Sequence, residues 1–191
     1  MVYLPALLEL NLQLSDEQFF QLCQQHRDLK FERTANGELT IMSPTGGMTS
    51  NRNAELIYQL MAWNRSTKLG KVFDSSGGFK LPNGANRSPD ASWVRRERWN
   101  ALTAEEQAKF VPLCPDMVVE LRSPSDDLSK LQAKMQEYRK NGAELGWLID
   151  PERQIVEIYR PHREPEILSS PKTLSGETIL PDFELDLTGI L

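Results

Sequence analysis

The stretch from Pro115 to Ser125 constrains the fold of this chain more than any other. It predicts a short buried strand between two prolines. The apolar residues of this strand are Met117, Val118, Val119 and Leu121. Side chains alternate between the two faces of a strand, so Glu120 and Arg122 should share one face. A buried charge is unfavourable unless it is paired or binds a metal. Glu120 and Arg122 are therefore either an ion pair at the edge of a sheet or part of a site.

Length and composition limit the classes of protein to consider. The 191 residues suit a single domain, residues 1–191, with a full hydrophobic core. No apolar run approaches the ~20 residues that a membrane helix needs. No basic segment precedes the leucines near the N-terminus, so we expect no signal peptide and a cytoplasmic protein. Two cysteines without a CxxC spacing predict free thiols, and two histidines argue against a histidine-rich zinc site.

The first forty residues contain two local structure signals. Ser15 and Gln18 form a capping box, which predicts that a helix begins there. Asn36-Gly37 separates strand-like runs at 29–34 and 38–42, the pattern of a two-stranded hairpin. Before them, the apolar residues 1–14 suggest an extended lead-in.

The longest helical pattern covers residues 49–68, and Gly70 can end it. Glu55 lies on one flank of its apolar stripe, where a carboxylate is by default solvated. Strand-like segments follow at 71–75 and 79–81, and Asp90 begins another short strand.

The sequence of the second half of the chain predicts two helices and several strands. A helix over 127–140 ends at Asn141-Gly142. Lys134 falls at the edge of its buried stripe, beside Leu131 and Tyr138, and an edge lysine can deliver its ammonium to a site. Thr103 and Glu106 form a second capping box, for a helix over 104–110. Strands are expected at 145–149, 155–160, 166–169 and 173–180, and a tail with alternating apolar residues from Phe183 to Ile190 should dock on the sheet.

Asp90 and Glu120 are candidates for a metal site. Two carboxylates on neighbouring strands suit a hard divalent cation, either Mg²⁺ or Mn²⁺. Such a metal neutralises a phosphodiester and lowers the pKa of a bound water. A nearby lysine or arginine stabilises the transition state. This set of residues predicts metal-dependent hydrolysis of phosphodiester bonds.

The ordered motifs also resemble a known family. Pro89-Asp90 followed by Glu120-Leu121-Arg122 resembles the PD-(D/E)XK signature of restriction-type nucleases. The longer set is more specific and resembles the Uma family of restriction endonucleases, which is abundant in cyanobacteria. That set comprises residues 89–94, residues 115–126, Lys134 with Tyr138, and residues 142–151. The resemblance extends over about residues 15 to 185.

The resemblance implies an α/β (α+β) fold with a restriction-endonuclease-like core. In that fold a mixed β-sheet is flanked by helices, and here it would carry an extra N-terminal hairpin and C-terminal strands. It implies DNA as partner, Mg²⁺ on Asp90 and Glu120, and a glutamate on the first core helix, for which Glu55 is the candidate. Arg122 departs from the family pattern, because arginine stays protonated and cannot act as a base. Lys134 is therefore preferred for the catalytic lysine, with Arg122 as a possible contributor.

Two interpretations remain open. The first is an Mg²⁺-dependent DNA endonuclease, with basic groups at Arg87, Arg95, Arg96 and Lys130 on the DNA backbone, acting as a homodimer. The second is a nuclease-fold protein without cleavage activity, a nucleic-acid-binding or regulatory module. Arg122 and the net charge of −5 favour the second. Metal binding at Asp90 and Glu120 would discriminate between them. A glycosidase using the same carboxylates is a weaker alternative, since nearby cations do not serve that chemistry.

Overall fold

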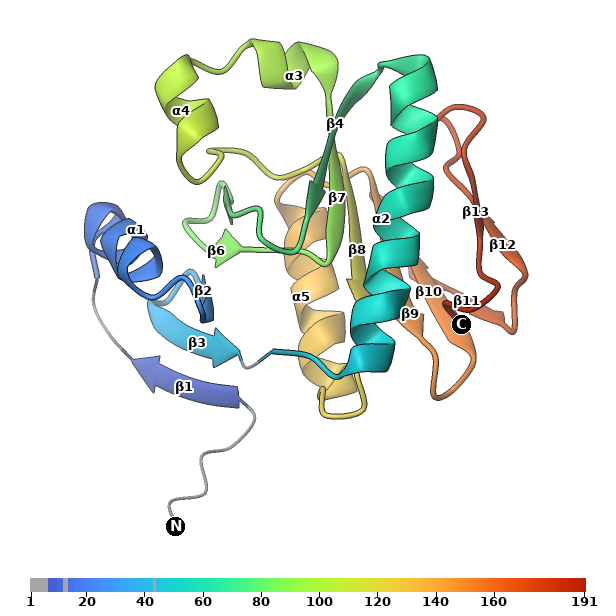
Figure 1. Ribbon diagram of the computed structural model, residues 1–191, viewed down its shortest axis with the longest axis horizontal. Coiled ribbons are helices and arrows are strands. Elements are labelled where there is room, and N and C mark those ends of the chain that lie inside the picture. Colours follow the sequence, from blue (N-terminus) through green and yellow to red (C-terminus); the bar gives the residue numbers. More distant parts are fainter. Residues whose placement is uncertain (1–6, 12–13, 43) are drawn as a thin grey trace.

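A mixed six-stranded β-sheet forms the centre of the molecule (Figure 1). The computed structural model describes residues 7–11, 14–42 and 44–191. The strand order is β11 (Glu166–Ser169), β10 (Ile155–Tyr159), β9 (Leu145–Asp150), β8 (Met117–Leu121), β7 (Ala91–Arg95) and β4 (Gly70–Asp74). Strands β8 and β9 are parallel, and the other neighbouring pairs are antiparallel. The predicted mixed sheet is confirmed.

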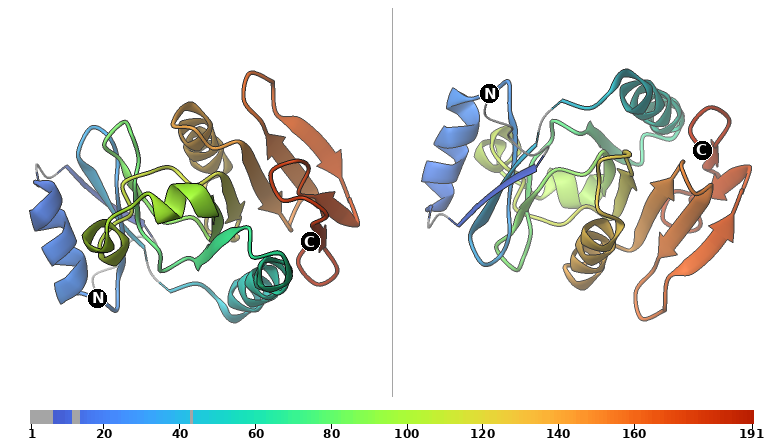
Figure 2. Two further views of the ribbon diagram at one scale, coloured as in Figure 1. Left: turned by 90° about the horizontal axis from the view of Figure 1, so that it is seen from above. Right: turned by 90° about the horizontal axis from the view of Figure 1, so that it is seen from below.

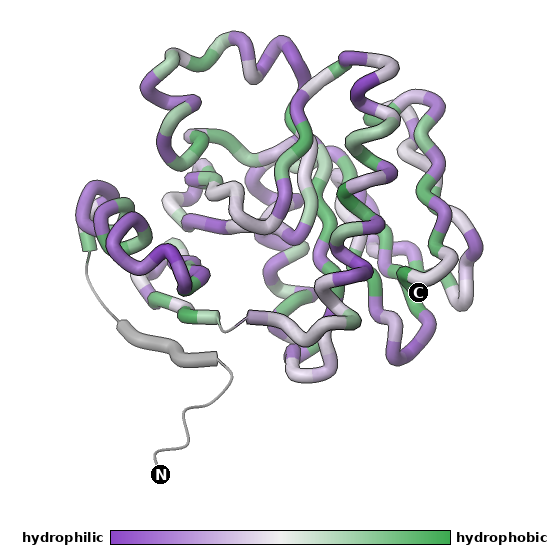
Figure 3. The backbone as a smooth tube through the Cα atoms, in the orientation of Figure 1, coloured by the Kyte–Doolittle hydropathy of each residue, from purple (hydrophilic) through white to green (hydrophobic). Residues whose placement is uncertain are grey.

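Two long helices cover the opposite faces of this sheet (Figure 2). Helix α2 (Gly47–Thr67) packs Leu56 and Leu60 on the face that carries Met117, Val119 and Leu121. Helix α5 (Leu128–Lys140) packs Met135 and Tyr138 on the face that carries Val118. The predicted alternation along β8 is therefore present, and it directs Glu120 toward α5. The most hydrophobic parts of the chain lie along these central strands (Figure 3).

A second sheet lies beside the first and is formed mainly by the N-terminal part of the chain. Its order is β1 (Leu7–Asn11), β3 (Glu38–Met42), β2 (Lys30–Arg33), β6 (Asn86–Arg87) and β5 (Phe79–Lys80). Helix α1 (Asp16–Gln25) packs on it through Phe19, which contacts Phe31 and Leu39 in a small separate core. The predicted hairpin is β2–β3, with Gly37 in the left-handed region at φ 88°.

Strand β2 alternates between two environments. Phe31 and Arg33 face α1, and the Arg33 guanidinium lies 5.0 Å from the centre of the Phe19 ring. Lys30 and Glu32 face the other way, toward the six-stranded sheet, where each forms an ion pair. The side of β2 away from α1 is therefore charged and points into the molecule.

The remaining elements connect or extend the two sheets. They are α3 (Arg96–Asn100), α4 (Ala104–Ala108), β12 (Thr173–Ser175) and β13 (Glu184–Asp186). Both predicted capping boxes form, at Ser15 with Gln18 and at Thr103 with Glu106. The tail docks as predicted, with Phe183, Leu185, Leu187 and Ile190 in the main core. Within the described residues, no helix combines the length and apolarity needed to cross a membrane.

Some element boundaries differ from the predictions. Helix α2 begins two residues before the predicted position 49 and ends at Thr67, one residue before the predicted 68; its C-cap is Lys68, in a left-handed conformation at φ 56°, and not Gly70. Gly70 is needed for close packing, because a Cβ there would lie 2.3 Å from the Val94 carbonyl oxygen and 2.4 Å from the Trp93 ring. The strand predicted over 173–180 stops at Ser175. The expected lead-in contains strand β1 at residues 7–11, which pairs with β3, while residues 1–6 and 12–13 lie outside the described part.

Candidate active site

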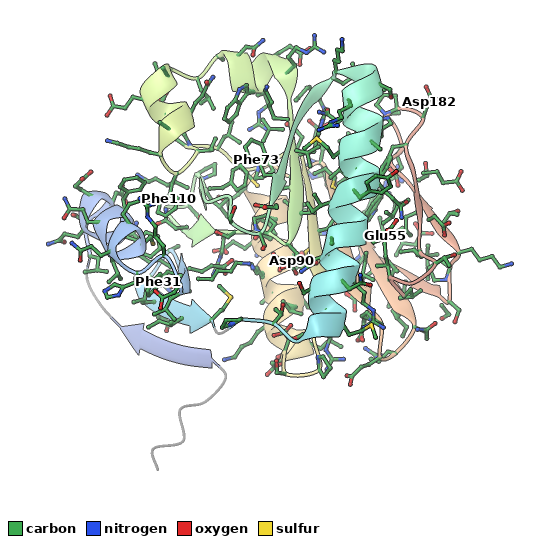
Figure 4. The ribbon with its side chains drawn as sticks, in the orientation of Figure 1. Phe31, Glu55, Phe73, Asp90, Phe110 and Asp182 are labelled. Atoms are coloured by element: carbon green, nitrogen blue, oxygen red, sulfur yellow. The ribbon has the colours of Figure 1, made fainter. Side chains whose placement is uncertain are left out.

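Asp90 and Glu120 meet at one end of the central sheet. Asp90 immediately precedes β7, and the β7–β8 register pairs Ala91 with Val119, so Asp90 comes level with Glu120. The Asp90 Oδ2 atom accepts a hydrogen bond of 2.9 Å from the backbone N–H of Leu121. Glu120 is only 4% exposed, whereas Asp90 lies nearer the surface, in the centre of Figure 4. The two predicted metal ligands thus lie at matching positions, Asp90 directly before β7 and Glu120 within the adjacent strand β8.

Lys134 joins these carboxylates from helix α5. Its Nζ atom lies 2.9 Å from Glu120 Oε1, and the Tyr138 hydroxyl donates a 3.0 Å hydrogen bond to the same oxygen. Lys134 and Tyr138 are four residues apart on α5, so both project from one face of the helix onto Glu120. The other Glu120 oxygen, Oε2, accepts no hydrogen bond from the described residues, and it can accept a further ligand.

Glu32 is a third carboxylate of the site, and our interpretation of the sequence missed it. It is 3% exposed, and its Oε1 atom lies 2.8 Å from Lys134 Nζ. The same oxygen accepts a 2.9 Å hydrogen bond from the Ser88 N–H, and Oε2 lies 3.2 Å from Arg87. Both oxygens of Glu32 are therefore engaged within the protein, so Glu32 holds the cations of the site and is not positioned as a free metal ligand.

Lys30 was also missed. It lies two residues before Glu32 on the same face of β2, and its Nζ atom is 3.8 Å from Asp90 Oδ1. The only sequence signal for either residue is that Lys30 and Glu32 share one strand face, opposite the face of Phe31. A charged strand face ordinarily faces solvent. This face lines the site only because the second sheet packs against the first.

Burial and neighbouring charges give the two glutamates opposite pKa shifts. Burial raises the pKa of Glu120 to about 7 despite the ammonium of Lys134, and Asp90 and Glu32 add to the shift. Burial alone would raise the pKa of Glu32, but Lys134, Arg87 and Lys30 together lower it to about 2. Burial disfavours the charged form of Lys134, yet Glu120 and Glu32 raise its pKa above the ordinary value of 10.5. Glu32 and Lys134 therefore stay charged at neutral pH, whereas the pKa of Glu120 lies near neutral pH.

Arg122 is not part of this cluster. Strand β8 ends at Leu121, and the Arg122 Nη1 atom lies 2.9 Å from Oδ2 of Asp150, a buried residue at the end of β9. A second carboxylate, Glu152, is 3.6 Å away, and Arg122 Nε donates to the Asp126 carbonyl oxygen. The residue is held in an ion pair, as one interpretation of the sequence expected, but with Asp150 instead of Glu120. It joins two strand ends and has no contact with Asp90, Glu120 or Lys134.

Glu55 is also placed away from the site. It is exposed on the flank of α2 that faces the C-terminal strands, whereas Asp90 lies on the other side of the helix (Figure 4). Its carboxylate accepts a 3.0 Å hydrogen bond from Gln59, whose side chain also bonds the backbone of Asp186. The helical period showed which flank of α2 carries Glu55, but not which flank faces the site.

Replacing Glu55 with alanine is therefore expected to leave metal affinity and any nuclease activity within about twofold of the original protein. Surface changes away from buried networks typically alter stability by no more than ~0.5 kcal/mol, because solvent replaces the lost contacts. Mn²⁺ titration calorimetry and a nicking assay on the purified variant measure both quantities. A tenfold loss of either would show that Glu55 takes part in the site.

Two of the other basic residues expected on DNA, Arg87 and Arg95, form ion pairs. The Arg87 guanidinium contacts Glu32 and lies 2.6 Å from Glu137. Arg95 lies 3.0 Å from Glu144 and 3.8 Å from the buried Asp116. The Arg87 side chain is therefore held within the protein, whereas the Arg95 side chain stays 39% exposed.

The site fits a hard divalent cation held by few protein ligands. Among the described residues, no three His, Cys, Asp or Glu side chains are grouped so as to enclose a metal. Zinc cages need such a group. Magnesium is usually bound by one or two carboxylates, with waters and substrate phosphates completing its shell. Asp90 and Glu120, with Glu120 Oε2 unengaged, match this second arrangement.

Comparison with known proteins assigns the family. The model of the Uma2 family, described as "Putative restriction endonuclease", matches residues 16–188. The chain belongs to the Uma2 family. No curated protein matches it. Membership of the Uma2 family supports a nuclease function.

A solved structure shares the fold. The crystal structure of a "putative nuclease belonging to DUF820" from Anabaena variabilis superposes with a TM-score of 0.71 at 21% sequence identity. The match covers 84% of this chain and 88% of that chain. At this identity the likeness shows the fold alone, and it confirms the restriction-endonuclease-like core expected from the resemblance.

Proposed function

We propose that this Uma2 protein is a metal-dependent endonuclease that hydrolyses phosphodiester bonds in DNA. One observation carries the proposal: Asp90, directly before β7, lies level with Glu120 on the adjacent strand β8, and the Lys134 ammonium is 2.9 Å from Glu120. Two carboxylates and a lysine are the groups that metal-assisted phosphodiester hydrolysis requires. Family membership supports a nuclease, and the metal, the substrate and the site residues are our proposals.

The roles of the residues follow from their contacts. Asp90 and Glu120 would hold the metal, which when bound supplies charge neutralisation and an acidified water. Lys134 keeps its proton, because Glu120 and Glu32 favour its charged form, so it acts as a fixed positive charge and not as a base. Glu32 and Tyr138 hold Lys134 and Glu120 in place. Arg122 and Glu55 have no role in this scheme.

The proposal also favours an active enzyme over a non-catalytic module. Arg122 supported the non-catalytic interpretation because it occupies the lysine position of the sequence signature. Lys134 supplies the missing ammonium from helix α5, so the departure at Arg122 no longer argues against catalysis. Cutting both strands of a duplex is simplest for a two-fold symmetric pair, and we propose a homodimer, which light scattering can test.

The direct test is cleavage of supercoiled plasmid by the purified protein in Mg²⁺, in Mn²⁺ and in EDTA. We expect nicking with either metal and none in EDTA. Parallel reactions with single-stranded DNA and with RNA of the same sequence determine the preferred nucleic acid. A protein that cleaves none of them, and that releases no heat when titrated with Mn²⁺, would be the non-catalytic module instead.

Metal binding should depend on pH through Glu120. A carboxyl group with a pKa of about 7 is mostly protonated below that pH, and the metal must displace this proton. The apparent dissociation constant for Mn²⁺ should therefore rise by up to about tenfold for each pH unit below 7 and level off above it. Calorimetric titrations between pH 5.5 and 8.5 measure this slope. An affinity that stays constant from pH 5.5 to 7.5 would exclude Glu120 as a ligand with a raised pKa.

A further inference from the structure

Lys30 is held less tightly than the other cations of the site. Its side chain is 30% exposed, and its ion pair with Asp90 is long, at 3.8 Å. Lys134 is 11% exposed and has two carboxylates within 2.9 Å of its Nζ atom. A buried ammonium bound at such distances would lose both partners if it turned toward solvent, which is unfavourable. Lys134 is therefore confined to the protein, whereas Lys30 is able to move.

Arg87 is confined in the same way. Its Nη1 atom lies 3.2 Å from Glu32, and its Nε atom lies 2.6 Å from Glu137. Lys30 is thus the cation of this cluster that can reach an incoming anion without breaking a short ion pair. Its neutralising partner, Asp90, is also one of the two proposed metal ligands.

The charge balance of the cluster indicates how a bound metal would change its net charge. Its ionisable members are the carboxylates of Glu32, Asp90, Glu120 and Glu137 and the cations of Lys30, Arg87 and Lys134. With all of them charged, four negative groups face three positive ones, and one negative charge remains. A divalent metal would reverse this balance to one positive charge. One phosphodiester group, with its single negative charge, would then restore neutrality.

The position of Lys30 is fixed by the other face of its strand. Phe31 is buried against α1, and Arg33 lies over the Phe19 ring and hydrogen bonds Asn86. Because residues alternate along β2, these anchors keep Lys30 on the Asp90 side. The flexible stem of a lysine still allows its ammonium to shift by several ångströms while the strand stays in place.

We propose that Lys30 neutralises Asp90 in the metal-free protein and binds the scissile phosphate of the DNA once a metal occupies Asp90. Asp90 would then be neutralised by the metal it holds, and the Lys30 ammonium, which lies 3.8 Å from Asp90 Oδ1 in the metal-free protein, would be released to pair with a phosphate oxygen. This proposal rests on the proposed function, since it needs a metal at Asp90. It adds a substrate-binding residue from the second sheet.

Replacing Lys30 with methionine tests it, since this change keeps the stem and removes the charge. Mn²⁺ affinity without DNA should increase about threefold or more, because Asp90 loses its competing ammonium. Single-turnover cleavage in Mg²⁺ should fall at least about tenfold, because the phosphate loses a charge-assisted contact. Binding of a short duplex in Ca²⁺, a non-catalytic probe metal, should weaken as well. Lys30→Arg keeps the charge and should retain most of the cleavage.

Lys109→Met is the matched control. Lys109 pairs with a carboxylate, Glu105, at 2.9 Å on α4, and its removal should change neither Mn²⁺ affinity nor cleavage. If Lys30→Met binds Mn²⁺ more tightly and cleaves at the original rate, Lys30 only shields Asp90 and the phosphate contact is wrong. If it changes neither quantity, both halves of the proposal are wrong. If the unmodified protein neither binds Mn²⁺ nor cleaves, the proposed function itself fails, and this inference with it.

Discussion

Replacing Lys134 with methionine is expected to lower the free energy of unfolding by about 3–5 kcal/mol at pH 8. Methionine keeps an unbranched stem in the space between α5 and the sheet but removes the ammonium. Glu32 and Glu120, which are both buried, then lose the cation that lies within 2.9 Å of each. Removing one partner of a buried ion pair leaves an uncompensated charge, and here the network also includes a second carboxylate.

The pH dependence of this loss distinguishes a charge effect from a packing effect. Without the ammonium, the pKa values of Glu120 and Glu32 in the folded protein rise, while in the unfolded chain they stay near 4.5. The folded state then binds protons more tightly, so stability falls as the pH rises above 4.5. In the unmodified protein, where Lys134 is present, Glu120 already has a pKa of about 7. The difference in unfolding free energy between this protein and the Lys134→Met variant should therefore still grow above pH 7.

Urea denaturation followed by circular dichroism at pH 5 and pH 8 measures the deficit. Lys140→Met is the matched control, since Lys140 is exposed in the last turn of the same helix and should cost less than about 1 kcal/mol. Equal losses for the two variants, or a Lys134→Met deficit that is no larger at pH 8 than at pH 5, would contradict the contacts described here.

Removing either proposed metal ligand should have the largest effect on activity. Changing a residue that only orients a metal ligand typically costs 10–100-fold, so losing a ligand itself should cost at least about a hundredfold. We therefore expect Asp90→Asn and Glu120→Gln each to reduce metal-dependent cleavage by at least that factor, with a parallel loss of Mn²⁺ affinity. Asparagine can still accept the hydrogen bond from Leu121 N–H, so Asp90→Asn should fold normally.

Asp182→Asn provides the same chemical change away from the site. Asp182 is exposed, lies far from Asp90 in Figure 4 and adopts a left-handed conformation at φ 61°, which asparagine tolerates well. It should cleave DNA and bind Mn²⁺ like the unmodified protein. An Asp90→Asn variant that matches it in both assays would remove Asp90 from the proposed metal site.

Local sequence signals predicted most of the elements correctly. The Asn36-Gly37 hairpin, the two capping boxes and the buried strand around Val118 all depend on residues within a few positions of one another. Such signals act through backbone geometry and alternation, which do not require knowledge of the rest of the fold. The end of α2 was predicted to within one residue, but Gly70 does not cap it; Gly70 instead packs against the Trp93 ring, a contact between distant parts of the chain that local signals do not reveal.

The sequence predicted the grouping of those candidate residues whose positions depend only on the central sheet and helix α5. Asp90, Glu120 and Lys134 come together because β7, β8 and α5 are neighbours in the core that the resemblance implied. Glu32 and Lys30 were missed because their positions depend on how a second sheet meets the first. Glu55 was expected near these carboxylates but lies away from them, and nothing in its own helix indicates which of its flanks faces them.

The alternation of strand β2 has a consequence for how much of the chain can be removed. The N-terminal hairpin looked like an addition to a nuclease core, yet one side of its β2 strand anchors α1 and the other side carries Lys30 and Glu32. A shortened chain beginning after β2 would keep all six strands of the central sheet. It would nevertheless leave Lys134 with one carboxylate fewer and Asp90 open to solvent. Trimming this segment to obtain a minimal domain would therefore keep the central sheet but remove two charged residues, Lys30 and Glu32, from the proposed site.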